Sequence, residues 1–521
     1  MRDAGRFSYA CLVPLLAVCQ AVPASEVGTP GTGAGKEATD TAAQAARPNI
    51  VVVVVDDLRW DEFGASGHPY LETPNIDRLA AEGALFVNSF HAVPLCSPNR
   101  ASILTGQYPS RHGIVDNVAR NLASHRLETF PAALQETGYE TGFLGKWHMG
   151  NDPTPRPGFD YWVAQPGQGR TGDPELYEDG RMHVVEGYVT DVLTDRAVAF
   201  IERDRDGPFF LYLAHKAIHP DVQQLDDGST DPNSMLGYLP APRHRGRYDD
   251  ELFVRRPNMI DSLDDLADKP ALQGALAERE ALDAAGDFGG PNPFRTPEET
   301  IRRRAEMLLA VDEGLGRIMA RLEELGMLDE TVVIFSSENG FFYGEHGLTS
   351  ERRMPYEESI RNPLLMRYPP LVEAGARPAG LALSVDIAPT ALEIAGAPIG
   401  DHIQGRSLVP LLRGEGDAWR DAVLVEFYTY ENPFRHLVDM DYRAVRTDRY
   451  KYIHWMKHPG MEELYDLETD PYEMDNRVND PALQEVKAGL TGQLRDLVLE
   501  AMGLAGNVRG QDLADTDRLD R

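Results

Sequence analysis

An uninterrupted run of β-branched residues near position 50 constrains the fold more than any other feature of the sequence. Residues 49–55 read Asn-Ile-Val-Val-Val-Val-Val, without the alternation of apolar and polar residues that a half-exposed strand shows. Such a run is typical of a strand that is buried on both faces of a parallel sheet. Further strands are expected at residues 141–144, 209–214 and 331–335, with helical patterns between them. This alternation predicts a doubly wound α/β core.

The chain of 521 residues is long enough for one large α/β domain and a smaller companion. We predict that the large domain covers residues 47–416 and contains a long insertion at about 221–295, which is rich in Asp, Pro and Gly. The residues Thr296-Pro297-Glu298-Glu299 are expected to cap and begin a long helix that ends at Gly326.

Residues 417–503 differ in pattern from the residues before them. Short strands are expected at 422–427 and 450–455, and one late helix around 481–502. This combination predicts a smaller α+β domain with an antiparallel sheet. Residues 504–521 are rich in acidic side chains and are expected to form a loose tail.

The first 24 residues have the order of a secretory signal peptide. Arg2 and Arg6 precede an apolar stretch from about residue 10 to 22, and Val-Pro-Ala stands before Ser25. The alternative, a membrane anchor, is disfavoured because the stretch is short and contains Pro14. We therefore expect passage through the secretion machinery, a periplasmic or secreted mature protein without a membrane anchor, and a flexible linker over residues 25–46.

The charge of the chain excludes some partners. Lys and Arg number 51 and Asp and Glu 83, so the net charge is −32. A protein that coats nucleic acid or an anionic membrane needs a basic face, so neither is expected as a partner. An anionic small substrate remains compatible, because one local pocket can be cationic.

The cysteine count narrows the chemistry. Cys11 and Cys19 lie in the predicted signal peptide, so its removal leaves Cys96 alone. A framework of disulfide bonds within one chain is therefore excluded. A single thiol in an oxidising compartment is either buried and inert or chemically used. The neighbours of Cys96 favour the second.

Acidic side chains follow two of the predicted strands. Asp56 and Asp57 come after the strand at 49–55, and Glu338 and Asn339 come after the strand at 331–335. Ligands of α/β sheets gather at the carboxyl ends of the strands. Three carboxylates and one amide oxygen form a set that suits Ca²⁺ or Mg²⁺. The alternative interpretation is a pair of acidic turns.

The residues around Cys96 form a specific motif. Residues 94–100 read Pro-Leu-Cys-Ser-Pro-Asn-Arg and are followed by Ala-Ser-Ile-Leu-Thr-Gly. This segment resembles the signature of the type I, formylglycine-dependent sulfatase family, which belongs to the alkaline-phosphatase-like superfamily. Other segments resemble the family in the same order, namely residues 138–148, 211–219, 338–340, 344–348, 356–359, 450–453 and 464–467. The similarity spans roughly residues 47–480.

The resemblance implies a fold and a reaction. The fold is an alkaline-phosphatase-like α/β sandwich, in which a large central mixed, mostly parallel sheet is flanked by helices, and residues 47–416 are its catalytic sulfatase domain. The reaction is the hydrolysis of sulfate monoesters. A maturation enzyme would convert the Cys96 thiol to formylglycine, whose hydrated aldehyde carries two hydroxyls. One oxygen attacks sulfur, and the other, once deprotonated, expels sulfate.

The resemblance also implies a bound cation. Ca²⁺, with Mg²⁺ as the alternative, would be held by Asp56, Asp57, Glu338, Asn339 and the modified Cys96. The ion would lower the pKa of the nucleophile and neutralise charge on the sulfuryl oxygens. Glu338 stands where most of the family has Asp, and its extra methylene changes the reach of the carboxylate by ~1.5 Å.

Five basic side chains have implied roles at the reacting ester. Arg100 would orient the diol, Lys146 would bind a sulfate oxygen, and His148 would take the proton that triggers release of sulfate. His219 would bind the substrate and protonate the leaving alcohol. Arg352 stands where a second sulfate-binding Lys is expected, and its planar guanidinium group would bind the sulfate through two hydrogen bonds.

Three functions are compatible with these residues. The first is an exported sulfatase that removes sulfate from a sulfated carbohydrate, either a small molecule or an oligosaccharide. The second is a phosphate or phosphonate monoester hydrolase on the same fold, which turnover of aryl phosphate against aryl sulfate would distinguish. The third is a non-catalytic relative that binds sulfated glycans. The convertible Cys96 disfavours this third function, because a binding protein has no need of it.

Overall fold

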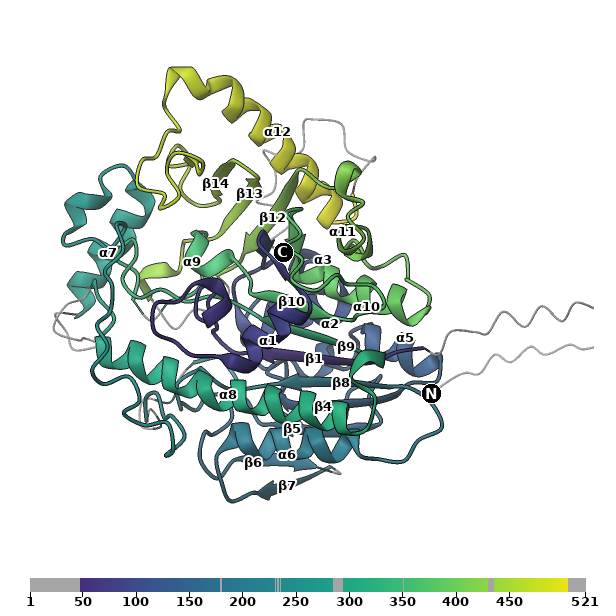
Figure 1. Cartoon of the computed structure of the whole chain (residues 1–521). Coiled ribbons are helices and arrows are strands. Elements are labelled where there is room, and N and C mark those ends of the chain that lie inside the picture. The colour runs from purple at the N-terminus through teal and green to yellow at the C-terminus, as the bar shows by residue number, and fades with distance from the viewer. Residues whose placement is uncertain are drawn as a thin grey trace, which may run out of the picture. The chain divides into compact units, whose positions relative to one another are not determined.

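A computed structural model describes residues 47–504, except for residues 179, 230, 232, 233, 235, 284–293, 350 and 430–434. The predicted signal peptide, the linker and the tail beyond Leu504 lie outside the described residues. The described residues from Arg47 onward belong to one compact unit (Figure 1). None of the helices in the described part of the chain combines the length and the apolar character that crossing a membrane requires.

Within the described residues, the core is a nine-stranded mixed sheet. Its strands, in spatial order, are β2 (Ala84–Phe86), β10 (Leu364–Arg367), β9 (Thr331–Ser337), β1 (Asn49–Val55), β8 (Phe209–Ala214), β4 (Glu140–Lys146), β5 (Tyr161–Gln165), β6 (Glu175–Glu178) and β7 (Arg181–Val184). The strands from β9 to β5 pair in parallel. Antiparallel strands are added at both edges. The predicted α/β class with a large mixed sheet is confirmed.

Helices cover both faces of this sheet (Figure 1). One face packs against α1 (Pro74–Glu82), α6 (Val189–Ile201) and α8 (Glu298–Glu324). The other packs against α2 (Cys96–Thr105), α5 (Phe130–Glu136) and α10 (Ile387–Ala395). Successive valines of β1 point alternately to these two apolar layers. This two-sided burial explains why β1 is apolar at nearly every position.

The C-terminal part contains a second, antiparallel sheet. Its strands, in spatial order, are β12 (Ala422–Phe427), β13 (Tyr442–Thr447), β14 (Tyr450–Trp455) and β15 (Glu463–Asp466). The helix α12 (Gln484–Ala501) packs against this sheet. The hydrophobic core that the sheet and α12 form also includes residues of α7 (Pro270–Asp283). The smaller α+β element is thus present, whereas the domain boundary that we place between residues 416 and 417 stays a prediction.

The described chain also contains shorter elements. They are the helices α3 (Pro109–His112), α4 (Asn121–Ser124), α9 (Glu357–Ile360) and α11 (Val409–Leu412), and the paired strands β3 (Ser89–Phe90) and β11 (Ala382–Leu383).

One local expectation is wrong. The long helix α8 occupies the expected region, but Pro297 stands at its N-cap position and Thr296 does not cap it. The Thr296 hydroxyl instead donates to the main-chain carbonyl of Phe342 at 3.3 Å. A tertiary partner has therefore replaced the local capping bond that the sequence pattern favours.

Candidate active site

The site lies where three strands of the parallel part of the sheet end, namely β9, β1 and β4. Asp56 and Asp57 follow β1, Glu338 and Asn339 follow β9, and Lys146 is the last residue of β4. Because these strands run parallel, their carboxyl ends meet at the same edge of the sheet. The two acidic pairs, which are far apart in the sequence, therefore lie together.

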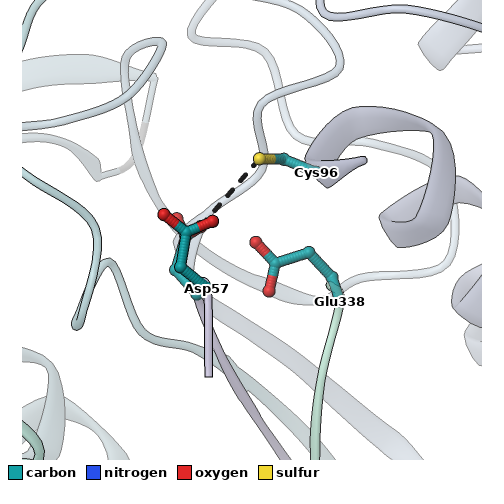
Figure 2. Close-up of side chains that lie close together, drawn as sticks. Asp57, Cys96 and Glu338 are labelled. Carbon is teal, nitrogen blue, oxygen red and sulfur yellow. Dashed lines mark hydrogen bonds between the residues drawn. The ribbon is translucent and has the colours of Figure 1, made fainter. Parts of the chain in front are cut away.

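Four buried side chains at this edge can hold a metal ion. One ligand atom from each of Asp56, Asp57, Cys96 and Glu338 lies within 4.8 Å of the others. All four side chains are buried. Figure 2 shows Asp57, Cys96 and Glu338 pointing toward the same space.

Two further observations show that a cation fits these residues. Glu338 Oε2 and Asn339 Oδ1 are buried and have no hydrogen-bond partner among the described residues. The Asn339 amide is fixed, because its Nδ2 donates to Asp57 Oδ1 at 2.8 Å and to the Gly340 carbonyl at 3.0 Å. An unpartnered buried oxygen costs about 1–3 kcal/mol, which a ligand would offset. Such oxygens are the donors that Ca²⁺ and Mg²⁺ prefer.

Two cations neutralise part of the acidic group. Lys146 Nζ forms a buried ion pair with Asp56. Arg100 Nη2 lies 3.0 Å from Glu338 Oε1 and 3.3 Å from Asp56 Oδ2. Burial alone would raise the pKa of Asp56, but Lys146 and the other cations hold that pKa well below its usual range. Burial raises the pKa of Glu338 well above its usual range, although Arg100 opposes this. A divalent cation would let both carboxylates ionise.

Helix α2 presents Cys96 to this group. Cys96 is the first residue of α2, and Arg100 lies one turn later on the same side. Cys96 Sγ is 4.0 Å from Asp56 Oδ1. Burial raises the pKa of the Cys96 thiol to about 12, against the opposing charges of Lys146 and Arg352. The unmodified thiol is therefore protonated at neutral pH and is a poor nucleophile.

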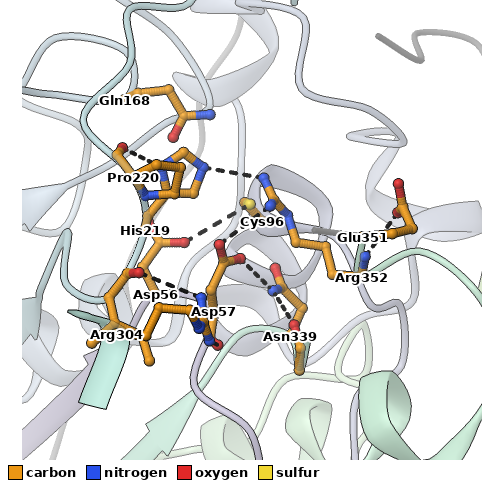
Figure 3. A network of polar contacts seen from close by, with 12 residues as sticks. Asp56, Asp57, Cys96, Gln168, His219, Pro220, Arg304, Asn339, Glu351 and Arg352 are labelled. Carbon is orange, nitrogen blue, oxygen red and sulfur yellow. Dashed lines mark hydrogen bonds and ion pairs between the residues drawn. The ribbon is translucent and has the colours of Figure 1, made fainter. Parts of the chain in front are cut away.

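Arg352 bridges the acidic group and His219 (Figure 3). Its Nη1 is 3.2 Å from Asp57 Oδ2, and its Nη2 is 3.1 Å from His219 Nε2. The other ring nitrogen of His219 lies 2.9 Å from the Pro220 carbonyl, so Nδ1 donates and Nε2 accepts. Burial and the charge of Lys146 hold the pKa of His219 well below its usual range, which agrees with a neutral ring.

His148 lies beside the start of α2. Its main-chain carbonyl accepts a hydrogen bond of 2.9 Å from the Ser97 hydroxyl. Its Nε2 contacts the side-chain oxygen of Gln224. Burial, followed by the charge of Lys146, holds the pKa of His148 well below its usual range. A neutral imidazole is therefore available as a base.

Comparison with known proteins decides the family. A family model described as Sulfatase matches residues 48–397, which is more than half of the chain. The chain belongs to the sulfatase family. A second model, described as the C-terminal part of N-sulphoglucosamine sulphohydrolase, matches residues 344–500 of this sulfatase. The protein is therefore a sulfuric ester hydrolase.

The sulfatase is similar to known proteins over most of its length, as the following comparisons show. The N-acetylglucosamine-6-O-sulfatase of Bacteroides thetaiotaomicron is 33% identical, and the match covers 83% of each chain. A protein solved with its substrate D-glucosamine-2-N,6-O-disulfate has a TM-score of 0.74 and 31% identity, covering 88% of this chain and 98% of that one. The phosphonate monoester hydrolase of Agrobacterium radiobacter shares the fold, with a TM-score of 0.66, 24% identity and coverage of 87% and 96%.

The structure of the sulfatase gathers all the residues that the sequence singles out. Contacts connect Cys96 to Asp56, Asp56 to Lys146 and Arg100, and Arg100 to Glu338. Further contacts connect Asn339 to Asp57, Asp57 to Arg352, and Arg352 to His219. His148 joins them through the neighbour of Cys96. The chemical role of each residue stays a prediction.

No role is assigned from the sequence to three side chains of the site. Asn99 contacts the chain at Glu338, Gln224 contacts His148, and Arg304 of α8 donates to the main-chain carbonyl of Asp57 at 2.7 Å. Asn99 lies inside the cysteine motif and offered a signal. Gln224 lies in the irregular segment after β8, and Arg304 in a long amphipathic helix, where no local pattern distinguishes them.

Proposed function

We propose that this sulfatase removes a 6-O-sulfate from an amino sugar by means of a formylglycine at position 96 and a bound Ca²⁺. The observation that carries the proposal is the buried group in which Cys96 faces Asp56, Asp57 and Glu338. The comparisons support the substrate class, because a similar protein is named N-acetylglucosamine-6-O-sulfatase and a similar structure was solved with a 6-O-sulfated glucosamine.

Formylglycine would supply two oxygens on one carbon, one to attack sulfur and one to expel sulfate. In the structure, Cys96 Sγ stands in for these oxygens. Every residue of α2 is buried, so a maturation enzyme would have to read this segment before the chain folds. A thiol has no second hydroxyl on the same carbon with which to expel sulfate, and this chemical difference supports a need for conversion.

The cations of the site have distinct tasks in this proposal. Lys146 and Arg352 bind the sulfuryl oxygens, and Arg100 orients residue 96 by charge-assisted hydrogen bonds. His148 holds the proton that residue 96 gives up. A sulfate ester bound next to Arg352 would accept the hydrogen bond that His219 Nε2 now accepts. His219 Nε2 is then free to carry the proton for the leaving alcohol.

A hard cation completes the charge balance. Asp56, Asp57, Glu338 and Asn339 would hold it with residue 96, and the two unpartnered oxygens of Glu338 and Asn339 support this assignment. We favour Ca²⁺ over Mg²⁺ because an irregular set of side-chain oxygens suits the flexible coordination of the larger ion.

The proposed place of action is outside the cytoplasm. The signal-like order of residues 1–24 supports export to the periplasm or the medium, where sulfated saccharides are accessible. The secretion machinery and a formylglycine-generating enzyme would then be the partners of the immature chain.

A substrate panel tests the proposal. The protein is co-expressed with a maturation enzyme and assayed on glucosamine derivatives sulfated at O6, O3 or N, on an aryl sulfate, and on aryl phosphate and phosphonate esters. We expect the O6 ester to be hydrolysed with the highest kcat/KM, and Cys96→Ser to be inactive on all of them. Faster turnover of the phosphorus esters would favour the alternative function, and preference for another position would overturn the substrate assignment.

A further inference from the structure

The side-chain amide of Gln224 is fixed in one orientation. Gln224 lies in the segment after β8, and its Nε2 donates a hydrogen bond of 2.7 Å to the main-chain carbonyl of Gly228. In the opposite orientation two carbonyl oxygens would face each other at this distance, without a proton between them. Oε1 of Gln224 must therefore point away from Gly228.

This oxygen accepts hydrogen bonds from two other side chains. Gln168 Nε2 lies 3.2 Å from Gln224 Oε1, and His148 Nε2 contacts the same oxygen. An amide oxygen has two lone pairs and can accept both bonds. Since Gln224 Oε1 has no proton to give, the proton between it and His148 must belong to Nε2.

The orientation of Gln224 thereby determines the state of the His148 ring. The ring is neutral at physiological pH, because burial and Lys146 hold its pKa well below the usual range. A neutral imidazole with its proton on Nε2 has a free lone pair on Nδ1. His148 Nδ1 is buried, and within the described part of the chain it has no hydrogen-bond partner.

The backbone of His148 is held as well. Its φ of 67° lies in the left-handed region, and its carbonyl accepts the Ser97 hydroxyl at 2.9 Å. Ser97 directly follows Cys96 in α2. His148 is thus held at two points, through its carbonyl at Ser97 and through its Nε2 at Gln224.

We propose that Gln224 is a positioning residue that fixes His148 in the Nε2–H tautomer and so reserves Nδ1 as the proton acceptor for residue 96. The acceptor role rests on the proposed function, whereas the tautomer does not. When Nδ1 takes the proton from the hydroxyl of residue 96, the ring becomes a cation, and the Gln224 oxygen stabilises it through Nε2–H. Gln224 then acts without touching the substrate.

The tautomer can be measured without turnover. Proton–nitrogen correlation spectra of the full-length, unconverted Cys96 protein, labelled with nitrogen-15 histidine, distinguish protonated from unprotonated ring nitrogens. The His148 signals are identified by their loss in His148→Gln. We expect Nε2–H in the wild type, and a substantial fraction of Nδ1–H in Gln224→Met, which keeps the side-chain length but cannot accept the bond.

Two variants control this experiment. Gln223→Met makes the same change at the neighbouring residue, whose side chain is exposed, and should leave the His148 spectrum unchanged. Gln224→Glu loses the bond to the Gly228 carbonyl but keeps an acceptor oxygen for His148, and it should restore a proton on Nε2. The proposal is overturned if the wild type carries its proton on Nδ1, or if Gln224→Met leaves the tautomer unchanged while its thermal unfolding matches that of the wild type.

Kinetics of the converted enzyme complete the test. A correctly placed base contributes about 10²–10⁴-fold to a rate, so Gln224→Met should lower kcat by about tenfold or more and change KM little. If Gln224→Met changed the tautomer of His148 but left kcat unchanged, His148 Nδ1 would not be the proton acceptor for residue 96. If the converted wild type hydrolysed no sulfate ester at all, the proposed function would fail, while the spectra would still decide the role of Gln224 in setting the tautomer.

Discussion

Asn99 Nδ2 donates a hydrogen bond of 2.6 Å to the main-chain carbonyl of Glu338. The same nitrogen lies 2.9 Å from His91 Nδ1, and Asn99 Oδ1 accepts the hydroxyl of Ser384 at 2.6 Å. All these groups are buried. Helix α2, which carries Cys96, is thereby connected to the end of β9, where two of the candidate metal ligands lie.

Removal of this connection should weaken metal binding. In Asn99→Ala the chain at Glu338 loses its donor, and we expect the affinity of the metal-free protein for Ca²⁺ to fall about tenfold or more, as for other residues that orient metal ligands. Calorimetric titration measures the change. Asn88→Ala removes a comparable bond, of 2.9 Å to the Ala379 carbonyl, away from the site and serves as the control. An equal loss in both variants would contradict the positioning role of Asn99.

Glu338 should not be replaceable by the shorter aspartate. Its carboxylate reaches from the end of β9 to Arg100 at 3.0 Å while keeping one oxygen unpartnered toward the acidic group. In Glu338→Asp the carboxylate is retracted by one methylene, so we expect Ca²⁺ affinity to fall by about tenfold. The same titration, with the buried Glu306→Asp as a control, tests this. A gain in affinity would show that the longer side chain is not matched to its backbone.

Arg352 should contribute to sulfate-ester hydrolysis through the planar, forked geometry of its guanidinium group as well as through its charge. It contacts Asp57 and His219 with two different nitrogens. Lysine offers a point charge and cannot reproduce both contacts. A lost hydrogen bond to a charged group is worth about 1.5–3 kcal/mol, so we expect Arg352→Lys to lower kcat/KM for an aryl sulfate by about 10–100-fold.

Two comparisons sharpen the Arg352 prediction. Arg352→Met should lose more activity than Arg352→Lys, because the charge is lost as well. Arg353→Lys changes the neighbouring residue, which pairs with Glu351, and should leave kcat/KM within a few-fold of the wild type. Equal activity of Arg352→Lys and the wild type would limit the role of this residue to its charge.

A buried acidic pair at the C-terminal sheet should make stability depend on pH. Lys451 of β14 pairs with both Glu357 of α9 and Glu473. Burial raises the pKa of Glu473 from 4.5 to about 8, although Lys451 opposes this. The folded state therefore keeps this proton up to about pH 8, whereas the unfolded chain loses it near 4.5. Protons bound in the folded state make stability fall as pH rises through this window.

Glu473→Gln removes this titration. We expect its free energy of unfolding, relative to the wild type, to increase steadily between pH 5 and 8 and then to level off, as measured by denaturant titration at several pH values. Lys451→Met should instead destabilise the protein by about 1.5–3 kcal/mol at neutral pH, because the buried Glu357 loses one of its cationic partners and keeps Arg446. A difference between Glu473→Gln and the wild type that did not change with pH would contradict the raised pKa.

Local sequence patterns predict the centre of the fold well. The strand at 49–55 is evident because both of its faces are buried, and the strands at 209–214, 422–427 and 450–455 have the predicted bounds. The strands β5, β6 and β7, which end one side of the sheet, are not evident from the sequence. Residues 181–184 are all exposed, and the four residues are too few for their alternation of polar and apolar side chains to predict a strand. They form a strand by pairing with β6 rather than by burial.

The site is predictable only where its residues lie in motifs. Cys96 and Arg100 share one turn of a helix, and the acidic pairs directly follow strands, so the sequence places them. Gln224 is connected to the candidate site by its contact with His148, and Asn99 by its hydrogen bond to the backbone of Glu338. Such contacts depend on how distant segments pack, so no local pattern distinguishes Gln224, and the motif around Cys96 does not show what Asn99 contacts.

The most direct test of the account is the mass of the tryptic peptide that contains Cys96, measured on the active enzyme together with its rate on an aryl sulfate. We predict that the fraction of peptide carrying an aldehyde in place of the thiol equals the active fraction across preparations with different degrees of maturation, and that Cys96→Ala is inactive although its thermal unfolding is nearly unchanged. Full activity in a preparation whose residue 96 is entirely thiol would contradict the account.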